Sequence, residues 1–317
     1  MKRIGNLFEK IYDFDNLWIA EAHACKGKKH RRNVQNFEEN LVENLDKLSE
    51  ELRTGTYKTS AYHTKTIYEP KERLIYILPY RDRVVQHAIL NILAPIWTKI
   101  FIAQTYACIK GRGIHKGVRE LKYILRRYPE ETTYCLKMDI RHFYPSIDHE
   151  LLKQIYRKKL KDPELLKLLD DIVDSAPGVP IGNYISQFFA NLFLTYFDHY
   201  LKEDLKVRFY LRYADDMVIL SSDKVVLHNI LNRIQQKMKE LHLILKPNYQ
   251  IFPVEDRGID FLGYIFRHKY TLLRKRMKLR AKKHPQGLVV YNGWLKYCNS
   301  KHLQLKLYET IKSPEMG

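Results

Sequence analysis

The sequence comprises 317 residues, of which 45% are hydrophobic, so the chain can fold around a large core. Lys and Arg number 55 against 36 Asp and Glu, which gives a formal net charge of +19. This excess is too large for an ordinary metabolic enzyme and indicates a polyanionic partner, most simply nucleic acid. The 23 tyrosines weaken the alternative of a merely solvated basic surface, because aromatic rings stack on bases.

The first half of the chain is expected to be mainly helical. Residues 1 to about 53 carry leucines at helical spacing, and Gly55 closes the segment. A strand is predicted over residues 73–80, and helical periodicity returns over 81–96. Residues 132–139 are apolar and rich in strand-forming side chains, which predicts a second strand.

The second half of the chain mixes helices with a short hairpin. Asp148 and Asp162 are expected to cap two successive helices, the second with Pro163 in its first position. The further predicted elements are a buried helix over 184–205, a β-hairpin around Ala214–Asp216, a helix over 224–242, a strand near 259–266 and a basic, helical stretch in the last 50 residues. The predicted fold class is therefore α+β, a small, partly antiparallel sheet backed by helices.

The cysteines and the apolar runs indicate where the protein resides. Cys25, Cys108, Cys135 and Cys298 lie far apart, with neither zinc-ligand spacing nor a disulfide pattern. The N-terminus has no apolar signal core, and the most apolar run, 188–197, is too short to span a bilayer. We therefore expect a cytoplasmic protein with no membrane partner.

Two adjacent carboxylates, Asp215 and Asp216, are expected at the tip of the hairpin. Each raises the pKa of the other unless a cation neutralises the pair. Asp is also common in hairpin turns for conformational reasons, so the pair alone does not define a site. A third carboxylate, Asp139, ends the strand predicted over 132–139. Three carboxylates so arranged can hold two Mg²⁺ ions that act on a phosphoryl group.

These residues lie in segments that resemble the motifs of reverse transcriptases, in the family's order. LKMDIRHFYPSID, GVPIGNYISQ and YADD resemble motifs A, B and C of that family. Three more segments agree with the fingers region, motif D and the approach to the primer grip, namely YEPKERLIYILPYRDRVVQHAI, LHLILKP and FLGY. The resemblance covers roughly residues 60 to 300. It implies a right-hand polymerase that copies an RNA template into DNA.

The resemblance assigns metal binding and leaving-group chemistry to particular residues. Asp139, Asp215 and Asp216 match the metal ligands, with the carbonyl of Ile140 as a further ligand for the two Mg²⁺ ions. Lys246 matches the lysine of motif D that is proposed to protonate the pyrophosphate leaving group. A charge at a strand edge is an equally good interpretation of Lys246.

Other matching residues are expected to bind the incoming deoxynucleotide. Tyr144 lies five residues after Asp139, where the family places a steric gate against the ribose 2′-hydroxyl, and this spacing favours the gate over the alternative of a core aromatic residue. Arg73 and Lys71 match the basic pair that meets the triphosphate, and exposed basic residues are often only solvated.

Motif B indicates a subtype of the family. Many relatives have Gln-Gly-x-x-x-Ser-Pro, whereas this chain has Ile181, Gly182 and Gln187 at the first, second and last of these positions. These departures resemble reverse transcriptases of diversity-generating retroelements, which implies mutagenic retrohoming by a bacterial or phage-encoded enzyme. Because Ile181 offers no hydrogen-bonding group, we expect error-prone copying, chiefly at template adenines.

The resemblance also implies domains and partners. The fingers are expected over residues 1–130, the palm over 131–266 with a fingers insertion at about 150–180, and the thumb over 267–317. The implied partners are template RNA, the RNA/DNA hybrid, dNTPs and a small, basic, oligomeric accessory variability protein. Basic segments at 26–32 and 274–284 are candidate RNA or accessory surfaces.

Three alternatives remain open at this level. The first is a reverse transcriptase of the retron or group II intron type, which motif B argues against. The second is an RNA-dependent RNA polymerase, which Tyr144 argues against. The third is a non-catalytic RNA-binding protein, which the presence of all three carboxylates argues against.

Overall fold

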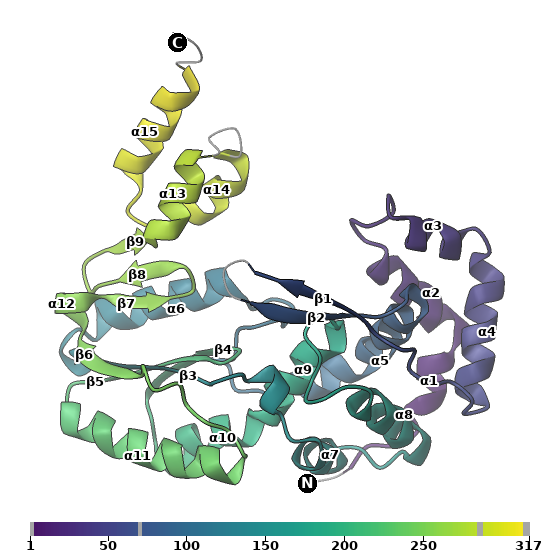
Figure 1. Cartoon of the computed structure of the whole chain (residues 1–317). Helices are drawn as coiled ribbons and strands as arrows, with labels where there is room; N and C mark the ends of the chain where they lie inside the picture. The colour runs from purple at the N-terminus through teal and green to yellow at the C-terminus, as the bar shows by residue number, and fades with distance from the viewer. Residues whose placement is uncertain (1–2, 69–71, 284–287, 313–317) are drawn as a thin grey trace. The chain divides into compact units, whose positions relative to one another are not determined.

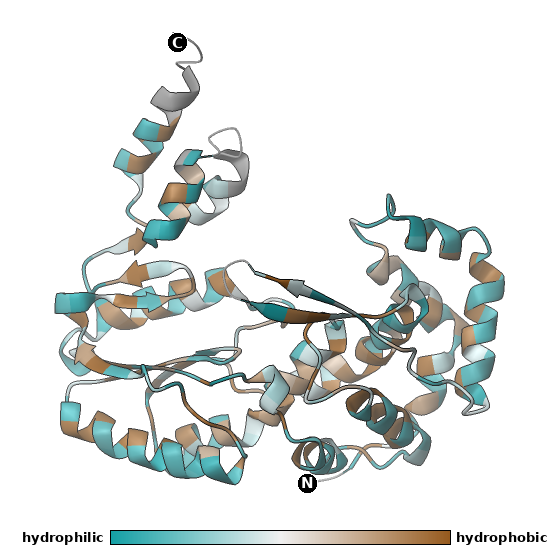
Figure 2. Cartoon of the chain, in the orientation of Figure 1, coloured by the Kyte–Doolittle hydropathy of each residue, from teal (hydrophilic) through white to brown (hydrophobic). Residues whose placement is uncertain are grey.

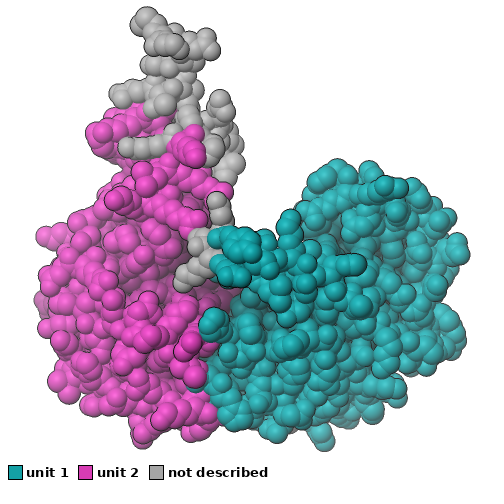
Figure 3. All heavy atoms as spheres, viewed as in Figure 1, with its two compact units in different colours: residues 1–102, 142–198, 241–243 teal, residues 103–141, 199–240, 244–317 magenta. Residues whose placement is uncertain are grey.

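The computed structural model describes residues 3–68, 72–283 and 288–312 (Figure 1). The chain divides into two compact units (Figure 3). Their residue ranges show that the chain passes between them several times. Unit 1 comprises residues 1–102, 142–198 and 241–243, and unit 2 comprises residues 103–141, 199–240 and 244–317. Helices and antiparallel sheets are both present, as the α+β prediction requires.

Unit 1 is mainly helical. Its helices are α1 (Phe8–Tyr12), α2 (Phe14–Ala24), α3 (Arg32–Glu38), α4 (Leu41–Arg53), α5 (Tyr80–Thr98), α7 (His149–Arg157), α8 (Pro163–Asp174), α9 (Tyr184–Phe193) and all but the last residue of α10 (Thr195–His199). The predicted helical N-terminus is thus confirmed, divided into four helices. The predicted helix over 81–96 is α5, which begins one residue earlier and ends two residues later.

A two-stranded antiparallel hairpin, β1 (His63–Ile67) with β2 (Arg73–Ile77), completes unit 1. The strand predicted over 73–80 is therefore too long, because Pro79 occupies the N-cap position and Tyr80 already begins α5. Proline has no N–H to donate to a sheet, and its fixed φ suits the entry to a helix. Strand β1 is mostly exposed and lacks an apolar alternation, so it was not predicted.

The helix predicted over 184–205 is interrupted. Helix α9 ends at Phe193, Leu194 leaves the helical region, and α10 leads into a π-helical turn over Tyr200–Asp204. The prediction of burial is confirmed for residues 188–194, which are all buried, whereas Tyr184, Glu203 and Asp204 at the two ends of the predicted range are exposed. Hydrophobic periodicity reports which face is buried and does not register a single residue that breaks the helix.

Unit 2 is built on a four-stranded antiparallel sheet with the order β4-β5-β3-β6. Its strands are β3 (Tyr134–Asp139), β4 (Phe209–Tyr213), β5 (Asp216–Ser221) and β6 (Gln250–Pro253). Helix α11 (Lys224–Glu240) covers one face of this sheet, and α6 (Ile114–Arg127) lies on the other (Figure 1). Figure 2 shows hydrophobic and hydrophilic residues alternating along α11, whose buried side chains recur at helical spacing.

A second, three-stranded sheet of unit 2 packs on the same hydrophobic cluster as α6. It consists of β7 (Ile259–Phe261), β8 (Tyr264–Phe266) and β9 (Thr271–Leu273), preceded by α12 (Val254–Arg257) and followed by α13 (Lys275–Lys283), α14 (Leu288–Leu295) and α15 (Lys301–Lys312). The single strand predicted near 259–266 is wrong, because Leu262 and Gly263 have positive φ and turn the chain into a hairpin. A Cβ at residue 263 would lie 2.8 Å from the Trp294 ring, so this turn requires glycine.

The two predicted aspartate caps differ in their partners. Asp148 caps α7 as expected, accepting a hydrogen bond from Leu151 N at 3.0 Å. Asp162 precedes α8, but its side chain instead accepts from Leu7 N at 2.8 Å and Phe8 N at 3.0 Å, at the start of α1. Asp162 thus ties the start of α1 to the start of α8. Among the described residues, no helix is long and apolar enough to cross a membrane.

We expect Asp162→Ala to lower the free energy of unfolding by about 1–3 kcal/mol, because two backbone N–H groups lose their acceptor in a largely buried place. Urea denaturation followed by circular dichroism measures the change. The exposed Asp46→Ala variant is the matched control and should change stability by no more than about 0.5 kcal/mol. Equal stability of the two variants would contradict this role for Asp162.

Candidate active site

The three predicted carboxylates meet at one end of the central strands of unit 2. Asp139 is the last residue of β3 and Asp216 the first of β5, and the two are directly opposite in the antiparallel register. Asp215 lies in the turn between β4 and β5, next to Ala214, whose φ is 54°. The structure therefore brings together residues that are far apart in the sequence, as the motifs predicted.

A buried arginine, which the sequence analysis missed, holds this turn. Arg212 is fully buried on β4, and its Nη1 donates a hydrogen bond to Ala214 O at 3.1 Å. Its backbone N–H donates to Gln104 O at 3.0 Å. Buried guanidinium groups are costly unless they are paired, so this bond fixes the conformation of the turn that carries Asp215.

Lys246 reaches the site through a short backbone pairing next to the end of β3. Lys246 N donates to Asp139 O at 2.8 Å, and Arg141 N donates to Ile244 O at 2.8 Å. Lys246 Nζ then lies 2.5 Å from Asp139 Oδ2. The predicted motif D lysine therefore contacts the first predicted metal ligand directly.

The same pairing orients the Ile140 carbonyl. Ile140 is opposite Leu245 in an antiparallel bridge, and the hydrogen bonds that flank this bridge are made by the neighbouring residues. In such a pair the residue's own N–H and C=O point away from its partner. The Ile140 carbonyl therefore points away from Leu245, as the predicted use of this oxygen as a ligand requires.

A second lysine, Lys137, was also missed. It lies two residues before Asp139, on the same face of β3, and forms an ion pair with Asp216. Burial lowers the pKa of Lys137 to about 8, although the Asp139 and Asp260 carboxylates act to raise it. A single lysine within an otherwise apolar strand next to a strand-end aspartate was the available signal.

The Asp215 carboxyl resists ionisation, chiefly because it is largely buried. Burial raises the pKa of Asp215 to about 6, and the adjacent Asp139 carboxyl adds to this effect, whereas Lys246 opposes it. Asp139 Oδ1 is buried, and no donor in the described part of the chain hydrogen-bonds to it. Clustered carboxylate oxygens that lack donors fit a hard divalent cation, because such ions prefer oxygen ligands.

The described residues that are predicted to bind nucleotide lie in unit 1, and a backbone hydrogen bond joins Ile181 to the strand that Arg73 begins. Tyr76 N, on β2, donates to Ile181 O at 2.8 Å. Gly182 has φ of 124°, and a Cβ there would lie 2.3 Å from Tyr76 O, so no other residue fits. Arg73 begins the same strand and is exposed.

Tyr144 belongs to the same part of unit 1. It begins a 3₁₀ turn over Tyr144–Ser146, and its carbonyl accepts a hydrogen bond from Val179 N at 2.9 Å. Val179 lies three residues before Gly182. Gln187 lies on α9, half-buried, and Lys71 lies outside the described residues. The predicted site residues are thus divided into two sets, one in each unit.

Asn183 is a further residue of this region that the sequence analysis missed. It is buried, and its Nδ2 donates to the Tyr62 hydroxyl at 2.8 Å, which in turn lies 2.9 Å from Ser175 Oγ. The Tyr62 ring also packs edge-on against Tyr76. These contacts join the loop of Ile181 to the residue that precedes β1, and nothing in the spacing of these residues indicates them.

Solved structures similar to this chain establish the fold. Apo telomerase from Candida tropicalis superposes with a TM-score of 0.51 over 70% of this chain and 52% of that chain, at 12% sequence identity. A form of that telomerase truncated from its C-terminal domain gives a TM-score of 0.52 over 71% of this chain and 59% of that chain, at 12% sequence identity. The predicted right-hand polymerase fold is therefore confirmed.

Sequence comparisons establish the family. Protein YkfC of Escherichia coli is 28% identical over 59% of this chain and 55% of its own length, and the retron Ec73 reverse transcriptase of Escherichia coli is 27% identical over 60% of each chain. The group II intron-encoded protein LtrA of Lactococcus lactis is 23% identical over 76% of this chain and 42% of its own length. The chain thus spans about half the length of these curated relatives. The family model for reverse transcriptase (RNA-dependent DNA polymerase) matches residues 58–266, and the chain belongs to this family.

Proposed function

We propose that this chain copies an RNA template into DNA at a centre formed by Asp139, Asp215 and Asp216. The observation that carries the proposal is the register of β3 and β5, which sets Asp139 opposite Asp216 and leaves Asp215 in the adjoining turn. Reverse transcriptase domains use divalent metal ions, and this cluster of hard oxygen ligands fits them. When bound, two Mg²⁺ ions held by the three carboxylates and the Ile140 carbonyl would activate the primer 3′-hydroxyl and neutralise the triphosphate.

The lysines of the site have separate roles in this proposal. Lys137 pairs with Asp216 and neutralises part of the charge of the carboxylates from within the sheet. Lys246 Nζ, now beside Asp139 Oδ2, is the proton donor to the pyrophosphate leaving group. An ammonium group can give up a proton to an oxygen that gains negative charge as its bond breaks, which is general acid catalysis.

Selection of the incoming dNTP is assigned to unit 1. Arg73, together with Lys71, would neutralise the triphosphate, and the Tyr144 ring would exclude a ribose 2′-hydroxyl. Gly182 allows the backbone of the motif B loop to approach Tyr76 O closely, and Gln187 follows on α9. The fixed backbone of this loop supports a role in positioning, because discrimination between similar nucleotides requires well-defined geometry.

The domain assignment and the partners form part of the same proposal. Residues 1–130, 131–266 and 267–317 serve as fingers, palm and thumb, with a fingers insertion at about 150–180. The net charge of +19 supports binding of template RNA and of the RNA/DNA hybrid through phosphates. If the enzyme is of the diversity-generating type, an accessory variability protein is a further partner.

Within the family, we propose the diversity-generating type, with copying that is error-prone at template adenines. The support is motif B, where Ile181 replaces a glutamine that could hydrogen-bond beside the nascent base pair. The Ile181 carbonyl is already engaged by Tyr76 N, so the side chain is the part of this residue that is free to affect fidelity. The alternative is a reverse transcriptase of the retron or group II intron type, which the similarity to relatives of these two types supports.

Primer extension on an RNA template with Mg²⁺ and dNTPs tests the activity. We expect Asp216→Asn to reduce DNA synthesis by about a hundred-fold or more, because loss of a metal ligand removes several kcal/mol of charge stabilisation. The exposed Asp204→Asn variant in the same unit is the control and should extend primers like the parent. Parent and Asp216→Asn chains that extend primers equally would exclude this centre.

Sequencing of the extension products tests the subtype. We expect Ile181→Gln to lower misincorporation opposite template adenine by a few-fold, because one added hydrogen bond is worth about 1 kcal/mol. Ile19→Gln, an identical change at an exposed position of α2, serves as the control. An accurate parent enzyme, or an error rate that Ile181→Gln leaves unchanged, would refute the mechanism.

The raised pKa of Asp215, from 3.8 to about 6, predicts a stability effect without metal. The folded state then binds this proton more tightly than the unfolded state, so stability falls as pH rises from about 4 to 6 and stays lower above. In EDTA, Asp215→Asn should therefore raise the free energy of unfolding by about 1 kcal/mol at about pH 8, after allowance for solvent screening, and by about half as much near pH 5. Urea denaturation at both pH values measures this, and a destabilised variant at pH 8 would contradict it.

A further inference from the structure

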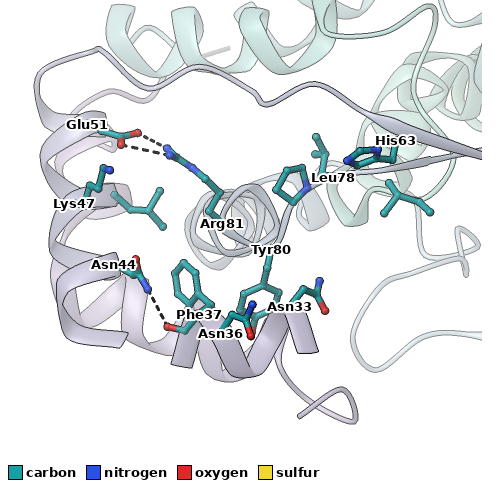
Figure 4. Close-up of a pocket in the computed structure, with 13 residues that line it drawn as sticks. Asn33, Asn36, Phe37, Asn44, Lys47, Glu51, His63, Leu78, Tyr80 and Arg81 are labelled. Carbon is teal, nitrogen blue, oxygen red and sulfur yellow. Dashed lines mark hydrogen bonds and ion pairs between the residues drawn. The ribbon is translucent and has the colours of Figure 1, made fainter. Parts of the chain in front are cut away.

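A solvent-open pocket of about 560 Å³ lies in unit 1, among α3, α4 and the junction between β2 and α5 (Figure 4). This volume falls within the usual range for ligand pockets, about 300–1,000 Å³. None of the residues assigned to metal or nucleotide binding lines it. The lining residues are Asn33, Asn36, Phe37, Asn44, Lys47, Leu48, Glu51, His63, Ile77, Leu78, Pro79, Tyr80 and Arg81.

Two helices direct one face each into this pocket. On α3 the lining residues are spaced by three and four positions, and on α4 they recur at three, four and seven. Such spacing puts side chains on one side of a helix. The floor is apolar and aromatic, because Leu48 and Leu78 are buried and the Phe37 ring packs edge-on against Tyr80 at 5.2 Å.

Several polar groups hold the walls in place. Arg81 forms an ion pair with Glu51, and Asn44 Nδ2 donates to Phe37 O at 3.0 Å, as Figure 4 shows. The Tyr80 hydroxyl donates to Glu21 at 2.9 Å, outside the pocket. These contacts join α3, α4 and α5, so the pocket is a built feature of the unit.

Other polar groups of the lining have no partner in the described part of the chain. The side chains of Asn33, Asn36, Lys47 and His63 make no hydrogen bond or ion pair there, and all four are exposed at the opening. Their chemistry is mixed, with two neutral amides beside a single lysine. An amide offers both a donor and an acceptor, which suits the edge of a nucleobase, and an ammonium group suits a phosphate.

A strongly basic segment leads directly into the pocket. Residues 26–32, with the sequence KGKKHRR, end where α3 begins, next to Asn33. Two turns shape it, with Lys28 N bonded to Cys25 O and Arg31 N to Lys28 O. All but one of its residues are exposed, so its charge is available to a phosphate backbone that approaches the pocket.

We propose that this pocket binds one unpaired nucleotide of an RNA strand, with the adjacent phosphates on residues 26–32. The base lies against the Phe37 ring and is hydrogen-bonded by the amides of Asn33 and Asn36, while Lys47 pairs with its phosphate. Unstacked bases of single-stranded RNA are recognised in this way, by stacking and by contacts to base edges. The inference rests on the proposed function only in that the chain binds RNA, and the pocket is separate from the centre at Asp139.

The test measures binding of a fluorescein-labelled single-stranded RNA of about ten nucleotides to the full chain by fluorescence anisotropy. An excess of unlabelled primer–template occupies the polymerase centre beforehand. Asn36→Ala and Lys47→Ala should each weaken binding about five-fold, the loss that one hydrogen bond or phosphate contact gives. For a blunt RNA duplex of the same sequence, the affinity of each variant should fall less than about two-fold below that of the parent chain, because a paired base cannot enter the pocket.

Lys10→Ala, an exposed lysine of α1 outside the pocket, is the control for charge. Equal losses for Lys10→Ala and Lys47→Ala, or unchanged single-strand binding by both lining variants, would overturn the proposal. Crosslinking of a 4-thiouridine RNA to the α3 peptide that contains Phe37 supports it, and crosslinks confined to other peptides oppose it. Primer extension by the same variants should match that of the parent chain. A parent chain that does not extend primers would contradict the proposed polymerase activity and would leave the proposed RNA pocket to be decided by the binding data.

Discussion

The antiparallel register of β3 and β5 is the constraint on which the centre of unit 2 depends. It sets Asp139 opposite Asp216, an arrangement of like charges that opposes folding unless it is compensated. Compensation comes from within the same unit, through Lys137 on Asp216 and Lys246 on Asp139. The pairing of residues 244–246 with the end of β3 therefore does more than extend the sheet, because it delivers the second of these cations.

The loop of motif B in unit 1 is held by backbone contacts that do not depend on the side chain at residue 181. The contact between Ile181 and the β1–β2 hairpin is made by backbone atoms, and Gly182 is fixed by its closeness to Tyr76 O. A side chain at residue 181 can therefore differ without loss of this contact. Residue 182 is therefore restricted by its backbone conformation, whereas residue 181 is not restricted by this contact.

Sequence patterns predicted where the three carboxylates lie more completely than they predicted the surrounding elements. Motifs in order predicted that Asp139 and Asp215–Asp216 would meet, because strand ends and hairpin tips leave few alternatives. The patterns could not find β1, which is exposed and lacks apolar alternation, or the turn at Leu262 and Gly263, where an apolar run conceals a change of direction. Lys137 was missed for a related reason, since its partner is defined by strand pairing and not by spacing.

Lys246 illustrates how the observed pairing bears on the proposed chemistry. Lys246 Nζ lies 2.5 Å from Asp139 Oδ2, so the ion pair holds the lysine side chain against this carboxylate. A proton donor to a leaving group must be released from such a pair at the time of reaction. Any cation that takes over Asp139 Oδ2 removes the partner of Lys246, so occupation of the carboxylates and availability of the proton are linked. The ion pair would then keep the proposed proton donor in place until the site is complete.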